Sequence, residues 1–416
     1  MSTPEETKAM GSRIADLRRE RGLTQPELAV QVGRTASWMS QVERGVQPVN
    51  RLDVLRLLAD ALGVSLQTLQ PDAPTEAAPA TTEPAAAEQR NDLDQARLVI
   101  SGHPAPDVLL NGDAQPTPAN LPELRAGVEH VWDLTHADQF AELSAMLGKL
   151  VPRLERAVRT APAAEQPELS LLLARTYQAL AAAFVRQDEA DAAWLAADRA
   201  IGAAERSGQP LHVFAGVFRL AQAFVRLKHF DQAEHAATTA LNAVREHAKP
   251  AETEPEVLSV LGSLHLVLAL IHARAGDRTR ARTETENARA VARRLGEDRN
   301  DFNLEFGPTN VEIQAVSIAV DLGDAGEAIE IGQHVDASGL SVERQARLLM
   351  DLGRAYAQRR QSGEALDCLI RAEHLAPEVI HTHVAARNAI RELVLVAGRS
   401  ASPELKALAE RADAMP

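Results

Sequence analysis

The stretch that decides the fold is TQPELAVQVGRTASWMSQVER, residues 24–44. Thr24 suits the N-cap of a helix, because its hydroxyl can accept a hydrogen bond from a backbone amide of the first turn. Three apolar residues then recur at the spacing of one helical face, namely Leu28, Ala29 and Val32. The stretch therefore begins with a short amphipathic helix.

A second short helix follows in the same stretch. Gly33 predicts a tight turn, and Thr35 can cap the helix that comes after it. Met39 and Val42 lie at i, i+3 and would point inward. The residues left facing outward are Ser37, Trp38, Gln41 and Arg44. Two short helices around a glycine turn, the second with a polar face, predict a helix-turn-helix motif.

Apolar residues on both sides of this motif complete a small domain. Further helices are expected over roughly residues 5–21, from Asn50 onward, and over residues 64–69. Their inward-facing residues would be Ile14, Leu17, Leu52, Leu55, Leu58, Ala59 and Leu62. Five helices within residues 1–70 are enough for a compact all-α domain.

The segment GLTQPELAVQVGRTASWMSQVERG, residues 22–45, resembles the lambda-repressor-like helix-turn-helix domains of the Xre/Cro type. The resemblance implies a double-stranded DNA operator as partner and an ion pair between Arg18 and Glu43. The DNA-binding residues that it implies are Gln25, Arg34, Thr35, Ala36, Ser37, Trp38, Gln41 and Arg44.

The chemistry of these side chains divides their roles. Ser37 and Gln41 would face base edges in the major groove. Trp38 would press on sugar or a thymine methyl, or else serve as a half-buried packing residue. Because the Ala36 side chain is short and apolar, either the motif makes fewer direct base contacts or Ala36 contacts a thymine methyl. The remaining residues would hold phosphates without reading sequence, and these are Gln25, Arg34, Thr35 and Arg44.

Composition confines any DNA contact to this end of the chain. The net charge of the 416 residues is −14, whereas residues 1–70, with nine Lys/Arg and eight Asp/Glu, carry +1. An acidic remainder disfavours indiscriminate nucleic-acid binding.

The single cysteine, Cys368, excludes a disulfide framework and suits a reducing cytoplasm as a buried apolar residue. The N-terminal residues lack a signal-peptide pattern, and a cytoplasmic location is expected.

Two segments separate the small domain from the rest. Residues 71–90 hold four prolines among Ala, Thr and Glu, which predicts an extended tether. Residues 91–120 contain short apolar runs bounded by Pro or Gly, and we expect an irregular lead-in there without helices. From residue 121 to 416 the pattern is helical throughout.

The helical region repeats. Aligning its segments places alanines 193, 233, 281, 328 and 365 in one column. Twelve residues earlier stand Ala181, Ala221, Ala269, Val316 and Gly353, and nine residues earlier stand Phe184, Phe224, His272, Ala319 and Tyr356. Small residues let paired helices approach closely, and a ring fills the gap between them. The pattern resembles tetratricopeptide repeats, with Pro377 as the closing proline. We expect a solenoid of at least five repeats, and six or seven are also compatible with the pattern.

The resemblance implies a concave groove lined by the first helix of each pair. Groove-facing residues would be Arg175, Arg186, Gln222, Arg226, Ser263, Arg274, Asn310, Asp321, Arg347 and Arg354. Arginine binds carboxylates in a bidentate fork, so an extended peptide or an anionic small molecule would suit such a groove. The alternative is that these arginines pair with Asp and Glu on adjacent helices.

A turn at FGPTNV, residues 306–311, and the segment HPAPDVLL, residues 103–110, resemble a group of actinobacterial helix-turn-helix regulators with tetratricopeptide-like C-termini. That resemblance places Phe306 and Asn310 at a ligand groove, beside Gln222, Arg226, Arg274, Arg347 and Arg354. Alternatively, these residues only turn the chain between helices. The architecture is also similar to that of peptide-pheromone-sensing regulators.

No catalytic constellation is found in the sequence. It lacks a phosphate-binding glycine loop, a nucleophile elbow and a metal-binding His-Glu-x-x-His. His381 and His383 lie at i, i+2 on an expected helix, where side chains diverge, so no metal or cofactor is expected.

The leading hypothesis is a homodimeric, ligand-responsive transcriptional regulator. The rival is a helix-turn-helix protein whose repeat region docks another protein and binds no diffusible ligand.

Overall fold

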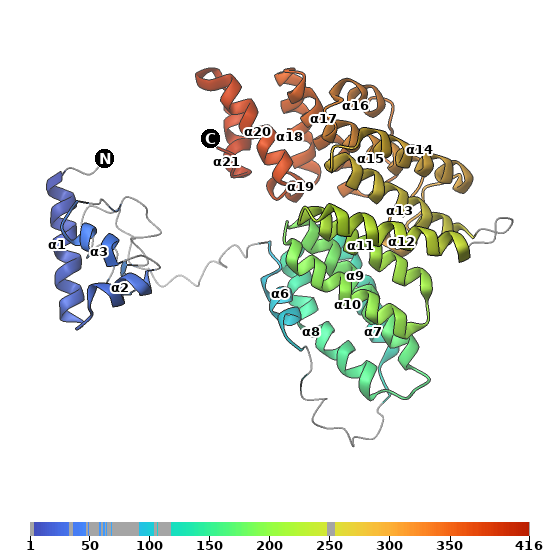
Figure 1. Cartoon of the computed structure of the whole chain (residues 1–416), viewed down its shortest axis with the longest axis horizontal. Coiled ribbons are helices and arrows are strands. Elements are labelled where there is room, and N and C mark those ends of the chain that lie inside the picture. Colours follow the sequence, from blue (N-terminus) through green and yellow to red (C-terminus); the bar gives the residue numbers. More distant parts are fainter. Residues whose placement is uncertain are drawn as a thin grey trace, which may run out of the picture. The chain divides into compact units, whose positions relative to one another are not determined.

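The computed structural model describes residues 4–32, 36–46, 49, 58–59, 61–62, 64, 68, 91–103, 106, 118–247 and 254–415. The chain forms two compact units, residues 1–87 and 88–416. Within the described residues, regular structure is helical apart from one bridge between Arg299 and Phe306 (Figure 1). The expected all-α fold, a small helical domain followed by a repeat-like helical region, is confirmed.

The first unit contains three described helices, α1 (Pro4–Glu20), α2 (Gln25–Gln31) and α3 (Ala36–Glu43). Helix α1 packs closely on α3, because a Cβ at Gly11 would collide with the carbonyl oxygen of Val42. The buried core comprises Ile14, Ala15, Leu28, Ala29, Val32, Met39, Val42, Val49, Leu58, Ala59 and Leu62. The predicted inward faces of these helices are thereby confirmed. Leu52 and Leu55, and most of the two later expected helices, lie outside the described residues.

The start of α2 is capped as the sequence predicts. The Glu27 amide donates to the Thr24 hydroxyl over 3.4 Å, and the Thr24 amide donates to the Glu27 carboxylate over 2.7 Å. This reciprocal pair is a capping box, which satisfies two backbone donors that the helix leaves unpaired. The entry to the helix-turn-helix motif is thus fixed by local side chains.

A helix precedes the repeats where the sequence predicted irregular structure. Helix α6 (Asp94–Ser101) buries Leu93, Ala96 and Ile100, and the Ala96 amide donates to the Ser144 hydroxyl over 3.0 Å. Eight residues cannot form a stable helix alone, so tertiary burial is what orders this segment. The expectation that residues 91–120 hold no helix was wrong for this part.

Long helices then follow one another in pairs. The first three pairs are α7 (Leu121–His136) with α8 (Phe140–Thr160), α9 (Gln166–Arg186) with α10 (Ala190–Ser207), and α11 (Pro210–Arg226) with α12 (Phe230–His247). The next three are α13 (Pro255–Arg274) with α14 (Arg278–Leu295), α15 (Pro308–Asp321) with α16 (Ala325–Gly332), and α17 (Val342–Gln358) with α18 (Ser362–Leu375). Helices α19 (Pro377–His381), α20 (Val384–Ala397) and α21 (Pro403–Arg411) end the described chain.

The aligned alanines mark one structural position. Each is the fourth residue of the second helix in its pair, and each is fully buried, as seen for alanines 193, 233, 281, 328 and 365. Five residues before each alanine, the backbone turns through a positive φ, at Asp188, Lys228, Gly276, Gly323 and Arg360. The same turn therefore closes every pair that the repeat pattern predicts.

The pair α7–α8 follows the same rule although the alignment missed it. Asp138 has φ 53°, and Leu143, five residues later, is fully buried. A leucine stands where the other pairs have alanine, so the small-residue column does not reveal this pair. The described residues thus contain six helix pairs closed by this turn.

Helix α13 is a long and strongly apolar helix. It is the one described helix that is long and apolar enough to cross a membrane by length and composition, but 89% of its most apolar window is buried inside the unit. Gly262 within it leaves room for the Phe306 ring, which is fully buried. Burial within the unit explains the apolar composition of α13 without a membrane.

The series of pairs curls until its ends meet. The Asn91 side-chain amide donates to the Glu378 carboxylate over 2.8 Å and also to the Asp138 carbonyl. The Thr382 hydroxyl donates to the Arg186 carbonyl over 2.9 Å. Residues separated by 196 and 287 positions in the sequence are therefore in direct contact.

Candidate nucleic-acid interface and ligand pocket

Glu43 at the end of α3 joins three elements of the first unit. Its carboxylate accepts two hydrogen bonds from the Arg18 guanidinium, at 2.6 and 2.9 Å, and one from the Gln25 amide at 2.7 Å. Burial acts to raise the pKa of Glu43, but the hydrogen bonds from Arg18 and Gln25 outweigh it and hold the pKa below its usual range. The predicted Arg18–Glu43 ion pair is confirmed, and it fixes α1, α2 and α3 together.

The other predicted DNA-binding residues lie in or beside α3. Gln41 is half-buried and Arg44 is exposed, with its Nε donating to the Ser40 carbonyl over 3.2 Å. Gln25 uses one amide proton on Glu43, and the second proton can still reach a phosphate. Arg34 and Thr35 lie outside the described residues. Ala36, Ser37 and Trp38 form the first turn of α3, but their side chains lie outside the described part.

Burial of Met39 and Val42 fixes which face of α3 packs against the domain. Residues 9–71 match a family model described as a helix-turn-helix domain. The first unit is a helix-turn-helix domain. No curated protein matches the chain. The helix-turn-helix domain identifies a DNA-binding regulator, and its match ends before the second unit begins.

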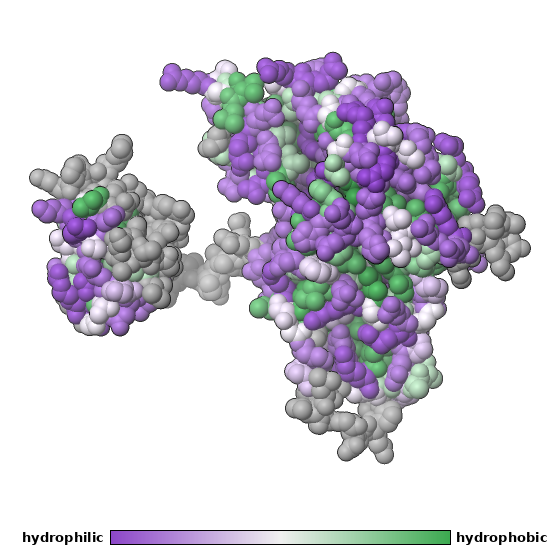
Figure 2. Space-filling view, viewed as in Figure 1, coloured by the Kyte–Doolittle hydropathy of each residue, from purple (hydrophilic) through white to green (hydrophobic). Residues whose placement is uncertain are grey.

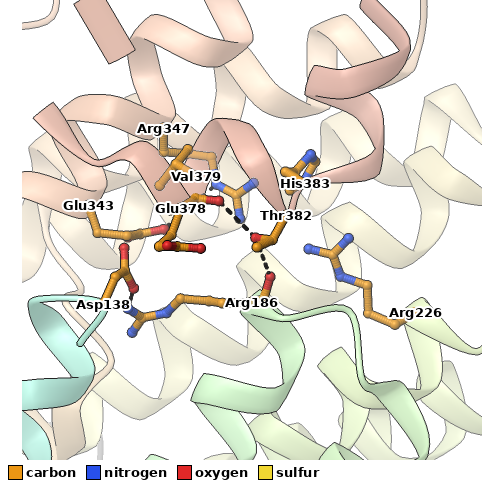
Figure 3. A pocket seen from close by; sticks show the side chains of 9 residues that line it. All are labelled: Asp138, Arg186, Arg226, Glu343, Arg347, Glu378, Val379, Thr382 and His383. Atoms are coloured by element: carbon orange, nitrogen blue, oxygen red, sulfur yellow. Dashed lines mark hydrogen bonds and ion pairs between the residues drawn. The ribbon is translucent and has the colours of Figure 1, made fainter. Parts of the chain in front are cut away.

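Beyond the helix-turn-helix domain, a pocket lies where the ends of the repeat series meet (Figure 3). It encloses about 290 Å³, including the part open to solvent. Its walls come from the α7–α8 turn, the ends of α9 and α11, the start of α17, and α19 with the residues after it. The lining residues are Asp138, Arg186, Arg226, Glu343, Arg347, Glu378, Val379, Thr382 and His383.

Most of the arginines predicted to line a groove are instead paired within the unit. Arg175 lies 2.8 Å from Glu129, and Arg186 lies 2.6 Å from Asp138. The remaining close pairs are Arg274 with Asp321, Arg354 with Asp321 at 2.7 Å, and Arg354 with Asp351 at 2.6 Å. For these arginines the alternative interpretation, pairing with acidic residues on adjacent helices, describes the structure.

Arg226 and Arg347 differ from the other arginines. Their closest carboxylate oxygens among the described residues are those of Asp188, at 3.7 Å, and Glu343, at 3.9 Å. Both distances exceed hydrogen-bond length, and both side chains are largely buried. The structure thus brings together two of the predicted ligand-binding residues, and both line the pocket.

The remaining predicted ligand residues lie elsewhere. Phe306 is fully buried in the core beside Gly262, and Asn310 is buried with its amide donating to the Glu305 carbonyl. Gln222 is half-buried and accepts a hydrogen bond from Arg219, and Ser263 is buried in α13. None of them is among the lining residues of the pocket.

The pocket contains groups that the sequence did not single out for ligand binding. Glu343 is buried; burial alone would raise its pKa, but the charges of Arg344, Arg186 and Arg347 lower it to about 2. Burial lowers the pKa of Arg226 to about 10, and the guanidinium stays protonated at neutral pH. Arg226 was among the predicted ligand-binding residues, whereas Glu343 could not be assigned to the pocket from the sequence, because residues from distant helices make up this site.

His383 faces the pocket instead of belonging to a metal pair. Helix α19 ends at His381, whose Nε2 lies 2.8 Å from Glu373, while His383 follows the helix and is buried. Burial and the nearby arginine charges hold the pKa of His383 well below its usual range, so its imidazole is neutral. Among the described residues no group of three His, Cys, Asp or Glu could hold a metal ion.

Cys368 in α18 is the free cysteine of the chain, and it is buried as expected. Burial raises the pKa of its thiol to about 11, so the sulfur is protonated at neutral pH. A protonated, buried thiol is a poor nucleophile, and Cys368 acts as an apolar residue of the repeat core.

Proposed function

We propose that the chain is a cytoplasmic, sequence-specific transcriptional regulator of the Xre/Cro type. The observation that carries this proposal is the helix-turn-helix match over residues 9–71, together with the Arg18–Glu43–Gln25 network that sets α2 against α3. In this arrangement α3 enters the major groove, with Ser37 and Gln41 at base edges. Gln25, Arg34, Thr35 and Arg44 contact phosphates.

The second unit pairs two copies of the chain. One small DNA-binding module makes too few base contacts for high specificity, so a two-fold arrangement on two half-sites is expected. Exposed Trp194 and Leu195 on α10 support this part of the proposal, because aromatic residues are enriched in protein interfaces. Figure 2 shows hydrophobic residues over the middle of the visible face of this unit, among largely hydrophilic surroundings.

The repeats, which we assign to the tetratricopeptide-like class, also sense an effector. A peptide and an anionic small molecule are both compatible with helical repeats, and the charged lining of the pocket supports either. The effector acts through unequal affinity for two dimer arrangements that differ in half-site spacing. DNA affinity then depends on effector concentration.

Selection of bound DNA from a random pool tests the first part of the proposal. We expect an enriched motif made of two symmetry-related half-sites. A pool without enrichment would contradict sequence-specific recognition, and a single asymmetric motif would contradict the dimer. Light scattering of the Trp194→Ser variant, with Ser at exposed Leu98 as a matched surface control, measures the dependence of pairing on α10.

Comparing protein purified from its host with protein from a foreign host tests effector sensing. The hypothesis predicts that host extract changes the melting temperature and the operator affinity of the foreign-host protein. Identical values, unmoved by extract, would instead favour the rival function, a repeat region that docks another protein.

A further inference from the structure

The pocket at the closure of the repeat unit holds three charged groups without close partners. Arg226 and Arg347 have no carboxylate oxygen within hydrogen-bond distance among the described residues. The Glu343 carboxylate lies 3.5 Å from Arg344 and 3.9 Å from Arg347, also beyond a normal hydrogen bond. Other buried charged groups of the unit make closer contacts, such as Arg186 with Asp138 at 2.6 Å and Arg354 with Asp351 at 2.6 Å.

Burial makes this arrangement costly. The Arg226 and Arg347 side chains are only 16% and 22% exposed, and Glu343 is 7% exposed. Charges removed from water are stabilised only when hydrogen-bonded partners replace the lost solvation. A buried pair of guanidiniums at one wall therefore leaves a place for an anionic group, and Glu343 leaves a place for a cationic donor.

His383 adds a second, independent observation. It is only 8% exposed, it lines the pocket, and its Nδ1 has no hydrogen-bond partner among the described residues. Buried polar atoms in folded proteins nearly always have a partner. The neutral imidazole can donate one hydrogen bond, which a carboxylate oxygen beside the two arginines would accept.

The three carboxylates lie toward one side of the pocket, where Arg186 is paired with Asp138 and Arg347 is 3.9 Å from Glu343, whereas Arg226 lies apart from them (Figure 3). Figure 3 shows Asp138, Glu343 and Glu378 toward one side, and Arg226 and His383 toward the other, with Arg347 and Arg186 on the walls between them. Three carboxylates and three guanidiniums line the pocket, so its formal charge is balanced. A lining with equal numbers of positive and negative groups suits a ligand that carries both signs.

We propose that this pocket binds a small zwitterion of the free α-amino-acid class. Its carboxylate is held by Arg226, Arg347 and the Nδ1 of His383, and its ammonium group donates to Glu343. The empty space of about 290 Å³ includes the part open to solvent, so the choice of ligand rests on the charges of the lining and not on the volume. The inference rests on the proposed function only in taking this molecule as the effector.

Calorimetry of the full-length protein with each of the twenty common amino acids tests the proposal. We expect one of them, or a few related ones, to bind. Its carboxamide analogue and its des-amino analogue should each bind at least about thirty-fold more weakly, because each lacks one partner of a buried charge pair. A des-amino acid that binds as tightly as the amino acid overturns the proposal, and so does failure of all twenty to bind at millimolar concentration.

Variants locate the site. Arg226→Gln and Arg347→Gln should each weaken binding by at least about thirty-fold. Arg371→Gln on α18, an exposed arginine outside the pocket, is the matched control and should bind as the native protein does. Equal binding by all four proteins overturns the assignment. Circular dichroism shows whether each variant folds. If a variant does not fold, the carboxamide and des-amino analogues still test the proposal on the native protein.

Operator binding with and without the amino acid separates this inference from the proposed function. If the amino acid binds the pocket but leaves DNA affinity unchanged, the pocket assignment stands and effector sensing falls. If host extract shifts DNA affinity while no amino acid binds, effector sensing stands and the amino-acid assignment falls.

Discussion

Replacing Gly262 with alanine tests how the repeat helices pack. The added Cβ would lie less than 3.0 Å from Cζ and both Cε atoms of the buried Phe306 ring. The ring cannot retreat easily, because it is fully buried and the Phe306 carbonyl accepts a hydrogen bond from the Arg299 amide at 2.9 Å. Overpacking of this kind costs about 1–3 kcal/mol. Alanine in a helix interior gains about 1 kcal/mol over glycine, so we expect a net loss of up to about 2 kcal/mol.

The effect of Gly262→Ala on stability should change from a loss to a gain when Phe306 is replaced by leucine. Leucine lacks the Cε and Cζ atoms that collide with the new Cβ. In the Phe306→Leu background, Gly262→Ala should therefore stabilise the unit by about 1 kcal/mol, the helix-propensity gain alone. The resulting coupling energy of about 1–3 kcal/mol lies within the range for residues in direct contact.

Urea unfolding of the four proteins measures this cycle. A Trp38→Phe background leaves Trp132 and Trp194 as the only tryptophans, and both belong to the second unit. Their fluorescence then reports that unit alone. If Gly262→Ala shifts the urea midpoint equally in both Phe306 backgrounds, the contact between this helix position and the ring does not control packing, and the reasoning fails.

Three further predictions concern the repeat core, the pocket and DNA recognition. Ala281→Leu should destabilise the second unit by about 1–3 kcal/mol in urea unfolding, whereas Ala290→Leu on the exposed face of the same helix should change stability by less than about 0.5 kcal/mol. The pKa of Glu343 in the folded state is about 2, below the usual value of about 4.3. The stabilisation that its carboxylate gives to the folded state is therefore complete above about pH 4.3 and is lost as the pH falls toward 2. Unfolding at a series of acidic pH values should therefore show a weaker loss of stability for Glu343→Gln. In binding titrations, Gln41→Ala should change base preference, while Arg44→Ala should weaken all sequences alike and lower the salt slope by about 1.

The local features of the fold could be read from the sequence because short-range spacing determines them. Thr24 and Glu27 lie three residues apart, as a capping box requires, and both partners are visible in the sequence. The alanine column was equally readable, because one small residue per pair is needed where two helices approach closely. Leu143 shows the limit of that rule, since the same backbone turn accepts a larger side chain in the first pair.

The candidate ligand site could be predicted only in part. Repeat spacing placed Arg226 and Arg347 on inward-facing positions, and both line the pocket. Their neighbours Glu343 and His383 could not be foreseen, because the curvature that closes the unit accumulates from small rotations between pairs. The resemblance at residues 306–311 placed Phe306 and Asn310 at a ligand groove, yet both are buried, and Gly262 in α13 makes the room for the Phe306 ring.

The contacts of α19 with the start of the unit and with α9 change how the repeat unit should unfold. An open solenoid frays from its ends, because a terminal repeat has a neighbour on one side only. Hydrogen bonds from Asn91 to Glu378 and from Thr382 to Arg186 tie the start of the unit and the end of α9 to α19. The unit should therefore lose its structure in one cooperative step instead of unzipping. For the same reason, deleting one whole repeat, which an open array tolerates, would break the closure and remove the pocket with it.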